Sequence, residues 1–314
     1  MVARLCFATG NGKPNEFINM KTISLVIPVY NEEARLDKTF SSLASFSLPG
    51  GLMLEKVIFV DDGSTDGTVK KIKEFIKSST WEESWLHSVQ PATVPGGAKT
   101  STIPGVSVNL QLVSYKENRG KGYAIAAGMK ESTSDYSLFL DADMSTDLSE
   151  VRKFMPSIRE RIPIIIGTRK NSHSTVVRHQ PFIRESLGKA FTLLSNLILN
   201  TWVSDFTCGF KAFSREAKDA LFPNLKIEDW GFDAELMFLG RIAGFEYKEI
   251  PVIWSDDRRS KVNIIKDAPK SFWDLIYIRI MDVFGSYETG IKRTELRWFQ
   301  MLAKAVKTIR SYLF

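Results

Sequence analysis

No stretch of this sequence holds the roughly 18 consecutive apolar residues that a membrane-spanning helix requires. The opening residues also lack the long apolar core of a signal peptide. Cysteine is scarce, and Cys6 and Cys208 lie too far apart in the sequence to suggest a disulfide framework. The three histidines, His87, His173 and His179, do not show zinc-site spacing. These absences argue against a disulfide-stabilised secreted domain and a zinc protein, and they favour a reducing compartment.

Two common nucleotide-binding fingerprints are also missing. The first apolar run is followed by PVYNEE rather than by GxGxxG, which argues against a dinucleotide-binding dehydrogenase. No GxxxxGK[ST] occurs anywhere, so the chain is not a P-loop NTPase.

Short apolar runs alternate with helical patterns along most of the chain. This alternation predicts βαβ units and an α/β fold, with a mostly parallel sheet that is covered by helices on both faces. We expect strands at residues 23–29, 56–60, 110–115, 137–140 and 162–167, and helices at 34–43, 68–76 and 123–129.

The polar residues that follow these strands are the first candidates for chemistry, because ligands of such sheets bind beyond the carboxyl ends of the strands. Asp141 and Asp143 directly follow the strand at 137–140, and oxygen ligands of this kind suit Mg²⁺ or Mn²⁺ and a diphosphate. Asp61 and Asp62 open the loop DDGSTDG after the second strand. The alternative for both segments is an ordinary turn without a ligand.

The ends of the chain and one internal segment differ from the rest. Residues 1–21 are predicted to form a disordered tail, and residues 22–262 the main domain. The segment 81–109 is rich in proline and glycine and is interpreted as an inserted loop. Residues 263–314 are expected to form C-terminal helices.

Several motifs resemble family 2 glycosyltransferases of the GT-A fold in order and spacing: IPVYNEE, VDDGSTDGT, NRGKGYAIAAGM, FLDADMST and GTR. The later segments DFTCGFKAF, WGFDAEL and IPVIW with SKV resemble the group of dolichyl-phosphate glucosyltransferases and mannosyltransferases. The similarity extends over about residues 22 to 280. It implies an inverting hexosyltransferase with a GT-A domain.

The resemblance assigns roles to individual residues. It implies that Pro28, Tyr30 and Glu32 shape the nucleobase pocket, that Asp61 contacts the base or ribose, and that Asp62 and Lys121 also bind the donor. Asp141 and Asp143 would hold the diphosphate through Mg²⁺ or Mn²⁺.

Two cations, Arg169 and Lys261, are candidates to neutralise the leaving diphosphate or the acceptor phosphate. For each of them a surface salt bridge is the alternative. Asp205, Asp233 and Glu235 are further acidic candidates, and Trp230 is a candidate to stack on the sugar.

The resemblance favours UDP-glucose as the donor and a polyprenyl or dolichyl phosphate as the acceptor. A lipid monophosphate is already ionised near neutral pH, so its attack needs positioning and charge screening more than a base. A hydroxyl acceptor on a polysaccharide or glycolipid is the alternative, and Asp233 or Asp205 would then be its general base. GDP-mannose is the alternative donor, although Ser145 stands where the mannosyltransferases carry a glutamine that helps to bind metal.

The C-terminal residues form a basic amphipathic pattern. Between residues 288 and 310 six basic residues stand against two acidic ones, and they lie opposite an apolar face. This pattern favours an anionic membrane surface as a partner, at its cytoplasmic face, rather than nucleic acid. Residues 271–284 are a second candidate interfacial helix. Packing on the main domain or in a homodimer is the alternative.

Overall fold

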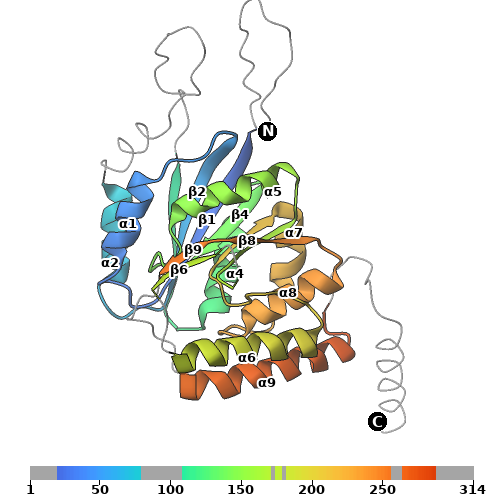
Figure 1. The fold of residues 1–314 in the computed structure, drawn as a ribbon. Coiled ribbons are helices and arrows are strands. Elements are labelled where there is room, and N and C mark those ends of the chain that lie inside the picture. The colour runs from blue at the N-terminus through green and yellow to red at the C-terminus, as the bar shows by residue number, and fades with distance from the viewer. Residues whose placement is uncertain (1–19, 79–107, 171–173, 179–181, 256–263, 288–314) are drawn as a thin grey trace, which may run out of the picture.

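A seven-stranded sheet runs through the middle of the protein, with helices on both of its faces (Figure 1). The structure is a computed structural model, and it describes residues 20–78, 108–170, 174–178, 182–255 and 264–287. Lys261, the segment 288–314 and nearly all of the predicted insertion lie outside the described residues, so the predictions for them stay predictions.

The strands of the main sheet lie in the order β3-β2-β1-β4-β7-β5-β8. Six of the seven are mutually parallel in direction, whereas β7 is antiparallel to its neighbours β4 and β5. A second sheet pairs β6 with β9. The strands are β1 (Lys21–Val29), β2 (Leu52–Asp62), β3 (Asn109–Tyr115), β4 (Tyr136–Leu140), β5 (Ile164–Thr168), β6 (Thr175–Arg178), β7 (Phe210–Ser214), β8 (Tyr247–Pro251) and β9 (Ile253–Ser255).

The helices connect these strands and cover them. They are α1 (Leu36–Ser45), α2 (Thr68–Lys77), α4 (Lys121–Glu131), the 3₁₀ helix η1 (Leu148–Phe154), α5 (Met155–Arg159), α6 (Phe182–Leu199), α7 (Arg215–Leu221), the 3₁₀ helix η2 (Phe222–Asn224), α8 (Phe232–Ile242) and α9 (Ile264–Val283). Of these, α6 and α9 lie side by side along one edge of the molecule (Figure 1).

Each face of the sheet has its own hydrophobic core. Successive side chains of a strand point to opposite faces, so Leu25 and Ile27 join one cluster and Val26 joins the other. The same alternation separates Phe59 from Ile58 in β2. A strand that is apolar on both sides is therefore stable only with helices on both faces, which is what the short apolar runs predicted.

The α/β class and the mostly parallel sheet are confirmed, and several boundaries are corrected. The second strand spans Leu52–Asp62 rather than 56–60, and the helix after the NRG turn begins at Lys121 rather than at residue 123. The first strand begins at Lys21, which the predicted tail had included. The helix α6 was not predicted at all.

The registers bring the functional segments to one edge of the sheet. Val29, the last residue of β1, pairs with Asp61 near the end of β2, and β1 also runs parallel to β4. Because β7 is antiparallel, its beginning lies at this same edge, where Phe210 pairs with Leu140. The loop before β7 therefore meets the residues that follow β4.

Candidate active site

Asp141 and Asp143 lie in a tight turn directly after β4. The backbone N–H of Met144 donates to the carbonyl oxygen of Asp141 at 3.1 Å, and Met144 adopts a positive φ of 50°. The Oδ1 atom of Asp143 accepts a hydrogen bond from the Ser145 N–H at 2.9 Å. Burial, and then the charge of Asp141, raises the pKa of Asp143 above its usual range. Two carboxylates held together in this way favour a cation between them.

Lys121 supplies one positive charge to this turn. Its Nζ atom, at the first residue of α4, lies 2.6 Å from Oδ1 of Asp141. The same Nζ lies 5.3 Å from the centre of the Trp230 ring. Lys121, Asp141 and Trp230, three residues that the sequence singled out, are thus brought together.

Lys211 and Asp233 form a second pair of charges, and both side chains are buried. Lys211 in β7 is fully buried, and its Nζ donates to Oδ1 of Asp233 at the start of α8. The same Nζ donates to the carbonyl oxygens of Phe206 and Cys208, both at 2.7 Å. Burial raises the pKa of Asp233, and Lys211 acts in the opposite direction. The predicted site residue Asp233 is therefore held by a lysine.

Sequence reasoning missed Lys211, although a signal was present. It is the one charged residue in the apolar strand FKAFS, and a lysine is almost never fully buried without a partner.

Arg169 and Asp205 form a third pair, at the end of β5. The guanidinium Nε and Nη2 atoms each lie 2.7 Å from one carboxylate oxygen of Asp205, and Nη2 also donates to Oγ1 of Thr207 at 2.8 Å. Burial acts to raise the pKa of Asp205, but the adjacent guanidinium outweighs it and holds this pKa well below its usual range. The ring of Trp254 lies 5.2 Å from the Arg169 guanidinium carbon. Arg169 thus lies at the site edge and is engaged by a buried carboxylate.

The loops after β1 and β2 are tied together at the predicted nucleobase pocket. The Asn31 N–H donates to Oγ of Ser64, and the Asn31 side-chain oxygen accepts from the Thr65 N–H, both at 2.8 Å. Oδ1 of Asp61 accepts from the Ser64 N–H at 3.0 Å, and its Oδ2 accepts from Oγ of Ser114 at 2.8 Å. The structure thereby brings Asp61 to the loop that contains Tyr30.

The other residues predicted for this pocket differ in exposure. Tyr30 is 38% exposed, and Pro28 is half-buried in β1. Glu32 is buried and forms an ion pair with Arg35, while its backbone N–H donates to Oγ1 of Thr68 at 2.7 Å.

Asp62 holds the start of α4 in place. Its carboxylate accepts hydrogen bonds from the Asn118 side chain and from the backbone N–H groups of Arg119 and Gly120, at 2.8–2.9 Å. Gly120 has a φ of 107°, where a side chain would also clash with the Glu228 carbonyl oxygen. Asp62 therefore positions the turn that delivers Lys121.

Glu235 points toward a different part of the protein. Its carboxylate accepts from the N–H groups of Lys226 and Ile227 and from the hydroxyl of Tyr287 at 2.6 Å. These partners fasten the loop before α8 to the residues after α9, so Glu235 connects structural elements rather than facing Asp141.

A bound cation fits the donor set of the turn at Asp141 and Asp143. The described residues contain no cluster of three or more His, Cys, Asp or Glu side chains placed to hold a metal. Two carboxylates alone leave most positions around Mg²⁺ or Mn²⁺ for oxygen atoms from a diphosphate or from water. No helix among the described residues is long and apolar enough to cross a membrane.

A family model and several curated proteins are similar to this chain. A family model for glycosyl transferase family 2 matches residues 24–86 and 107–222. The dolichyl-phosphate beta-glucosyltransferase of Drosophila melanogaster is 30% identical over 84% of this chain and 76% of its own length. The enzymes of the same name from Dictyostelium discoideum and Homo sapiens are 28% and 27% identical, over 85% of this chain and 76% and 78% of their own lengths.

Comparison with solved structures supports the fold. The glucosyl-3-phosphoglycerate synthase of Mycobacterium tuberculosis, crystallised with Mn²⁺, UDP and glucosyl-3-phosphoglycerate, superposes with a TM-score of 0.53. The alignment covers 90% of this chain and 88% of that one, at 17% sequence identity. The GT-A-like architecture predicted from the motifs is thereby confirmed.

Proposed function

The chain belongs to glycosyl transferase family 2, and we propose that it transfers glucose from UDP-glucose to a polyprenyl phosphate such as dolichyl phosphate. The similarity to dolichyl-phosphate beta-glucosyltransferases over most of the chain supports this substrate pair. The product would be a lipid-phosphate glucose with inverted, β configuration. The proposed location is the cytoplasmic face of a membrane, and a homodimer remains a prediction.

One observation supports a phosphate acceptor over a hydroxyl acceptor. Asp205 and Asp233, the carboxylates predicted as alternative bases, are buried and held by Arg169 and Lys211. A carboxylate whose charge is neutralised by a buried cation is poorly placed to take a proton from an incoming hydroxyl. A lipid phosphate, which is already ionised near neutral pH, needs no such step.

The donor side uses the carboxylates and the lysine at the end of β4. Asp141 and Asp143 would hold Mg²⁺ or Mn²⁺, and a bound cation would neutralise the charge of the diphosphate that leaves. Lys121, now 2.6 Å from Asp141, is placed to share that charge. Asp61 and Tyr30 border the proposed nucleobase pocket, and Trp230 is close enough to Lys121 to form the wall of the sugar site.

In the proposed reaction an oxygen of the acceptor phosphate attacks C1 of glucose from the side opposite the nucleotide. The bond from C1 to the diphosphate breaks, and UDP leaves with the electron pair. The protein positions the two substrates and screens their charges, and no protein group has to remove a proton.

A hydroxyl acceptor is the second candidate, and one observation favours it. Burial raises the pKa of Asp233 above its usual range, which makes this carboxylate a stronger base than an exposed aspartate. In that case Asp233 would have to be released from Lys211 when the acceptor binds.

In the deciding experiment the full chain is incubated with labelled UDP-glucose or labelled GDP-mannose, together with Mn²⁺ and a polyprenyl phosphate in detergent. The lipid product is then extracted. We expect label from UDP-glucose in the lipid phase. Label only from GDP-mannose would correct the donor. Transfer to glycan hydroxyls with no lipid-phosphate product would overturn the proposal.

A further inference from the structure

Helix α1 donates three hydrogen bonds to the turn that follows β4. The Nζ atom of Lys38 donates to the carbonyl oxygen of Asp143 at 2.7 Å and to that of Met144 at 3.1 Å. The next residue, Thr39, is buried, and its Oγ1 atom donates to the Ala142 carbonyl oxygen at 2.5 Å. Two adjacent residues of α1 thus hold three successive carbonyl groups of the turn.

The two other carbonyl groups of this turn have backbone partners. The Met144 N–H donates to the Asp141 carbonyl oxygen, and the Ser255 N–H in β9 donates to that of Ser145 at 2.9 Å. Each of the five carbonyl oxygens from residue 141 to residue 145 therefore accepts a hydrogen bond from the protein. Carbonyl oxygens can bind Mg²⁺ or Mn²⁺, but here they are directed at protein donors. The groups that the turn presents to a cation are the carboxylates of Asp141 and Asp143.

The backbone of this turn needs support from outside. Met144 has a φ of 50°, a region that residues other than glycine seldom adopt, and such a conformation persists only where surrounding contacts fix it. Lys38 bonds the carbonyl group of Met144 and that of the residue before it. The Lys38 side chain is exposed, so it is not needed to fill the hydrophobic core. Its hydrogen bonds therefore serve the turn rather than the packing of α1.

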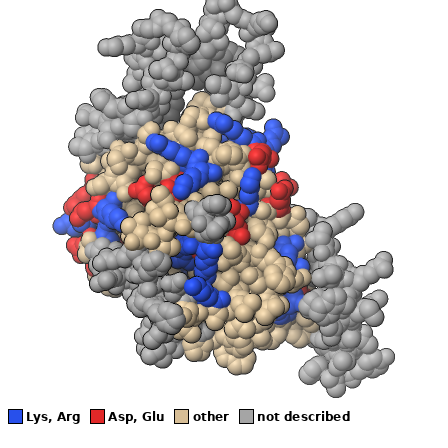
Figure 2. Space-filling view, viewed as in Figure 1, with Lys and Arg blue, Asp and Glu red and all other residues tan. Residues whose placement is uncertain are grey.

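The charges near Lys38 are mixed in sign. Asp37, the preceding residue, forms an ion pair with Lys71 of α2. Figure 2 shows basic and acidic side chains next to one another over α1 and α2. The fields of such exposed, alternating charges largely cancel and are screened by salt. We therefore expect Lys38 to influence the site through its two hydrogen bonds rather than through a general positive field.

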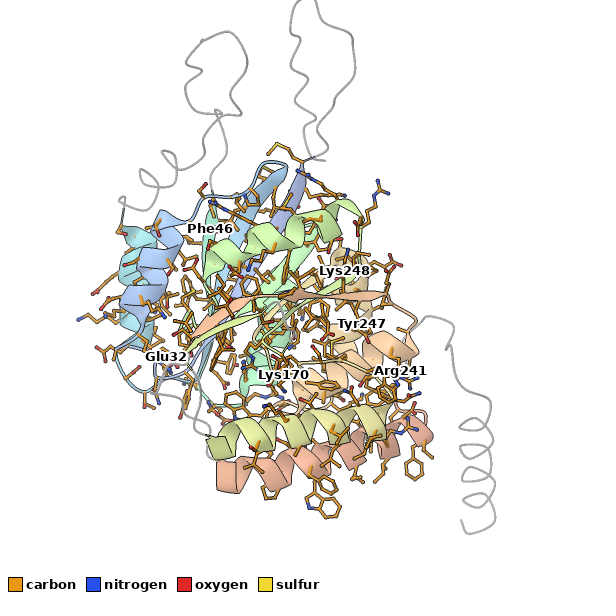
Figure 3. All side chains as sticks on the ribbon, viewed as in Figure 1. Glu32, Phe46, Lys170, Arg241, Tyr247 and Lys248 are labelled. Carbon is orange, nitrogen blue, oxygen red and sulfur yellow. The ribbon has the colours of Figure 1, made fainter. Side chains whose placement is uncertain are left out.

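The start of α1 also reaches the predicted nucleobase pocket. Glu32, in the loop after β1, forms a buried ion pair with Arg35, which directly precedes α1. Glu32 and Phe46 are labelled at the two ends of α1 in Figure 3. The short segment of residues 30–39 therefore borders the proposed nucleobase pocket at one end and holds the proposed diphosphate turn at the other.

We propose that Lys38 is a positioning residue for the cation and the nucleotide diphosphate. It fixes the backbone of Asp143 and Met144, so that the Asp141 and Asp143 carboxylates already face the donor site before a cation binds. Lys38 acts through the turn and not on the substrates, and Thr39 supports the same turn from the interior. This inference rests on the proposed function, because it takes the turn to be the site of a cation and a diphosphate.

The test measures the binding of Mn²⁺ to the full chain at saturating UDP by calorimetry, which does not depend on turnover. Lys38→Met removes the donor and keeps the length of the side chain. We expect the Kd for Mn²⁺ to rise about tenfold, as is typical when a residue that orients metal ligands is lost. The melting temperature should change little, because Lys38 is exposed. Lys38→Arg keeps donors at this position and should restore most of the affinity.

The matched control is Lys56→Met. The Nζ atom of Lys56 also donates to a backbone carbonyl oxygen, that of Glu131 at 2.9 Å, but Glu131 is the last residue of α4, at the end opposite Lys121. This variant removes the same charge and should leave the Kd for Mn²⁺ unchanged. In glucosyl transfer, Lys38→Met should raise the Mn²⁺ concentration that gives half the maximal rate, with kcat at saturating Mn²⁺ close to that of the wild type.

Equal Mn²⁺ affinity of Lys38→Met and the wild type would overturn the proposal. So would an equal loss of affinity in Lys38→Met and Lys56→Met, because general charge would then be the cause. A wild type whose UDP binding does not depend on Mn²⁺ would also overturn it, even if glucose is transferred. If the wild type binds Mn²⁺ with UDP but glucosylates no polyprenyl phosphate, the proposed function fails, and the Mn²⁺ affinities still decide the role of Lys38.

Discussion

The Nζ atom of Lys211 donates a hydrogen bond to Oδ1 of Asp233 in the interior between β7 and α8. Its other hydrogen bonds hold the turn from Phe206 to Cys208. The next residue, Gly209, lies so close to Asp141 that a Cβ atom there would be 2.1 Å from its Oδ2. Lys211 thus links Asp233 to the backbone against which the Asp141 carboxylate lies.

Replacement of Lys211 by Met should destabilise the protein by about 3–5 kcal/mol, because Asp233 would be left buried without its charged partner. Activity measured well below the unfolding temperature should also fall, since the turn before Gly209 loses two hydrogen bonds. Urea unfolding and glucosyl transfer are the measurements. The double variant Lys211→Met/Asp233→Leu should lose less stability than the sum of the two single changes.

The control for this prediction is Lys248→Met. Lys248 also pairs with a carboxylate, that of Glu160, but both side chains are about half exposed. Its loss should cost only about 0–1 kcal/mol. Equal effects of the two lysine substitutions would show that the buried pair has no special role.

Asp143→Asn should lower activity without lowering stability. Transfer should fall by about 10²–10³-fold, because the variant loses a ligand to the proposed cation at the diphosphate. Stability at pH 7 should be unchanged or slightly higher. The pKa of Asp143 is raised in the folded protein, so ionisation opposes folding as the pH rises through that pKa, and asparagine removes this penalty. Asp37→Asn, at an exposed side chain outside the site, is the matched control. Full activity of Asp143→Asn, or of the wild type in excess chelator, would refute the metal assignment.

Asp205→Asn should reveal a stabilising pair whose effect depends on pH. The folded-state pKa of Asp205 is lowered, so its contribution is present above the unfolded pKa of about 3.9 and is lost as the pH falls through the folded value. We expect a loss of about 3–5 kcal/mol at pH 7, because Arg169 is left without its buried partner. The difference in the free energy of unfolding between the wild type and the variant should shrink below about pH 4. Urea unfolding at several pH values across this range measures the difference, and Glu160→Gln in the exposed pair is the control. A difference in the free energy of unfolding that does not depend on pH would contradict the prediction.

The acceptor can be identified from a ranking of three variants. With a phosphate acceptor, Lys121→Met and Lys261→Ala should impair transfer more than Asp233→Asn, because charge must be screened and no proton removed. Arg169→Ala would leave Asp205 buried and unpaired, and Asp233→Asn would do the same to Lys211, so transfer is measured well below the unfolding temperature of each variant. The pH–rate profile of the wild type should show no dependence on a single base. Inactive Asp233→Asn beside nearly normal lysine variants would identify a hydroxyl acceptor instead.

Gly209→Ala should reduce transfer with a small effect on expression. The added methyl group would meet the Asp141 carboxylate and move it away from the proposed cation. Gly188→Ala in α6 is the control, because a Cβ there has nothing within 4 Å. That substitution should stabilise the protein by about 0.5–1 kcal/mol. Normal activity of Gly209→Ala would mean that the position of Asp141 is not critical.

Several parts of the fold and of the site could be predicted from local sequence. Runs such as ISLVIPV are apolar on both faces, which predicts a covered parallel strand wherever they occur. Asp61, Asp141 and Asp143 were found because polar residues at the carboxyl end of such a strand stand out against it. By contrast, β7 is short and interrupted by a lysine, and α6 is apolar on its outer side too, so neither shows a clear period.

The sequence by itself determined that the chain alternates strands and helices around a parallel sheet, and that its carboxylates collect at one edge. Both properties depend on neighbours in the sequence. Only the tertiary structure decided that Lys211 holds Asp233, that Arg169 holds Asp205, and that α6 lies beside α9. The charged partners are 22 and 36 residues apart, and their meeting depends on the antiparallel entry of β7 into the sheet. Because burial makes an unpaired charge costly, packing selects these partners, and no local pattern could specify them in advance.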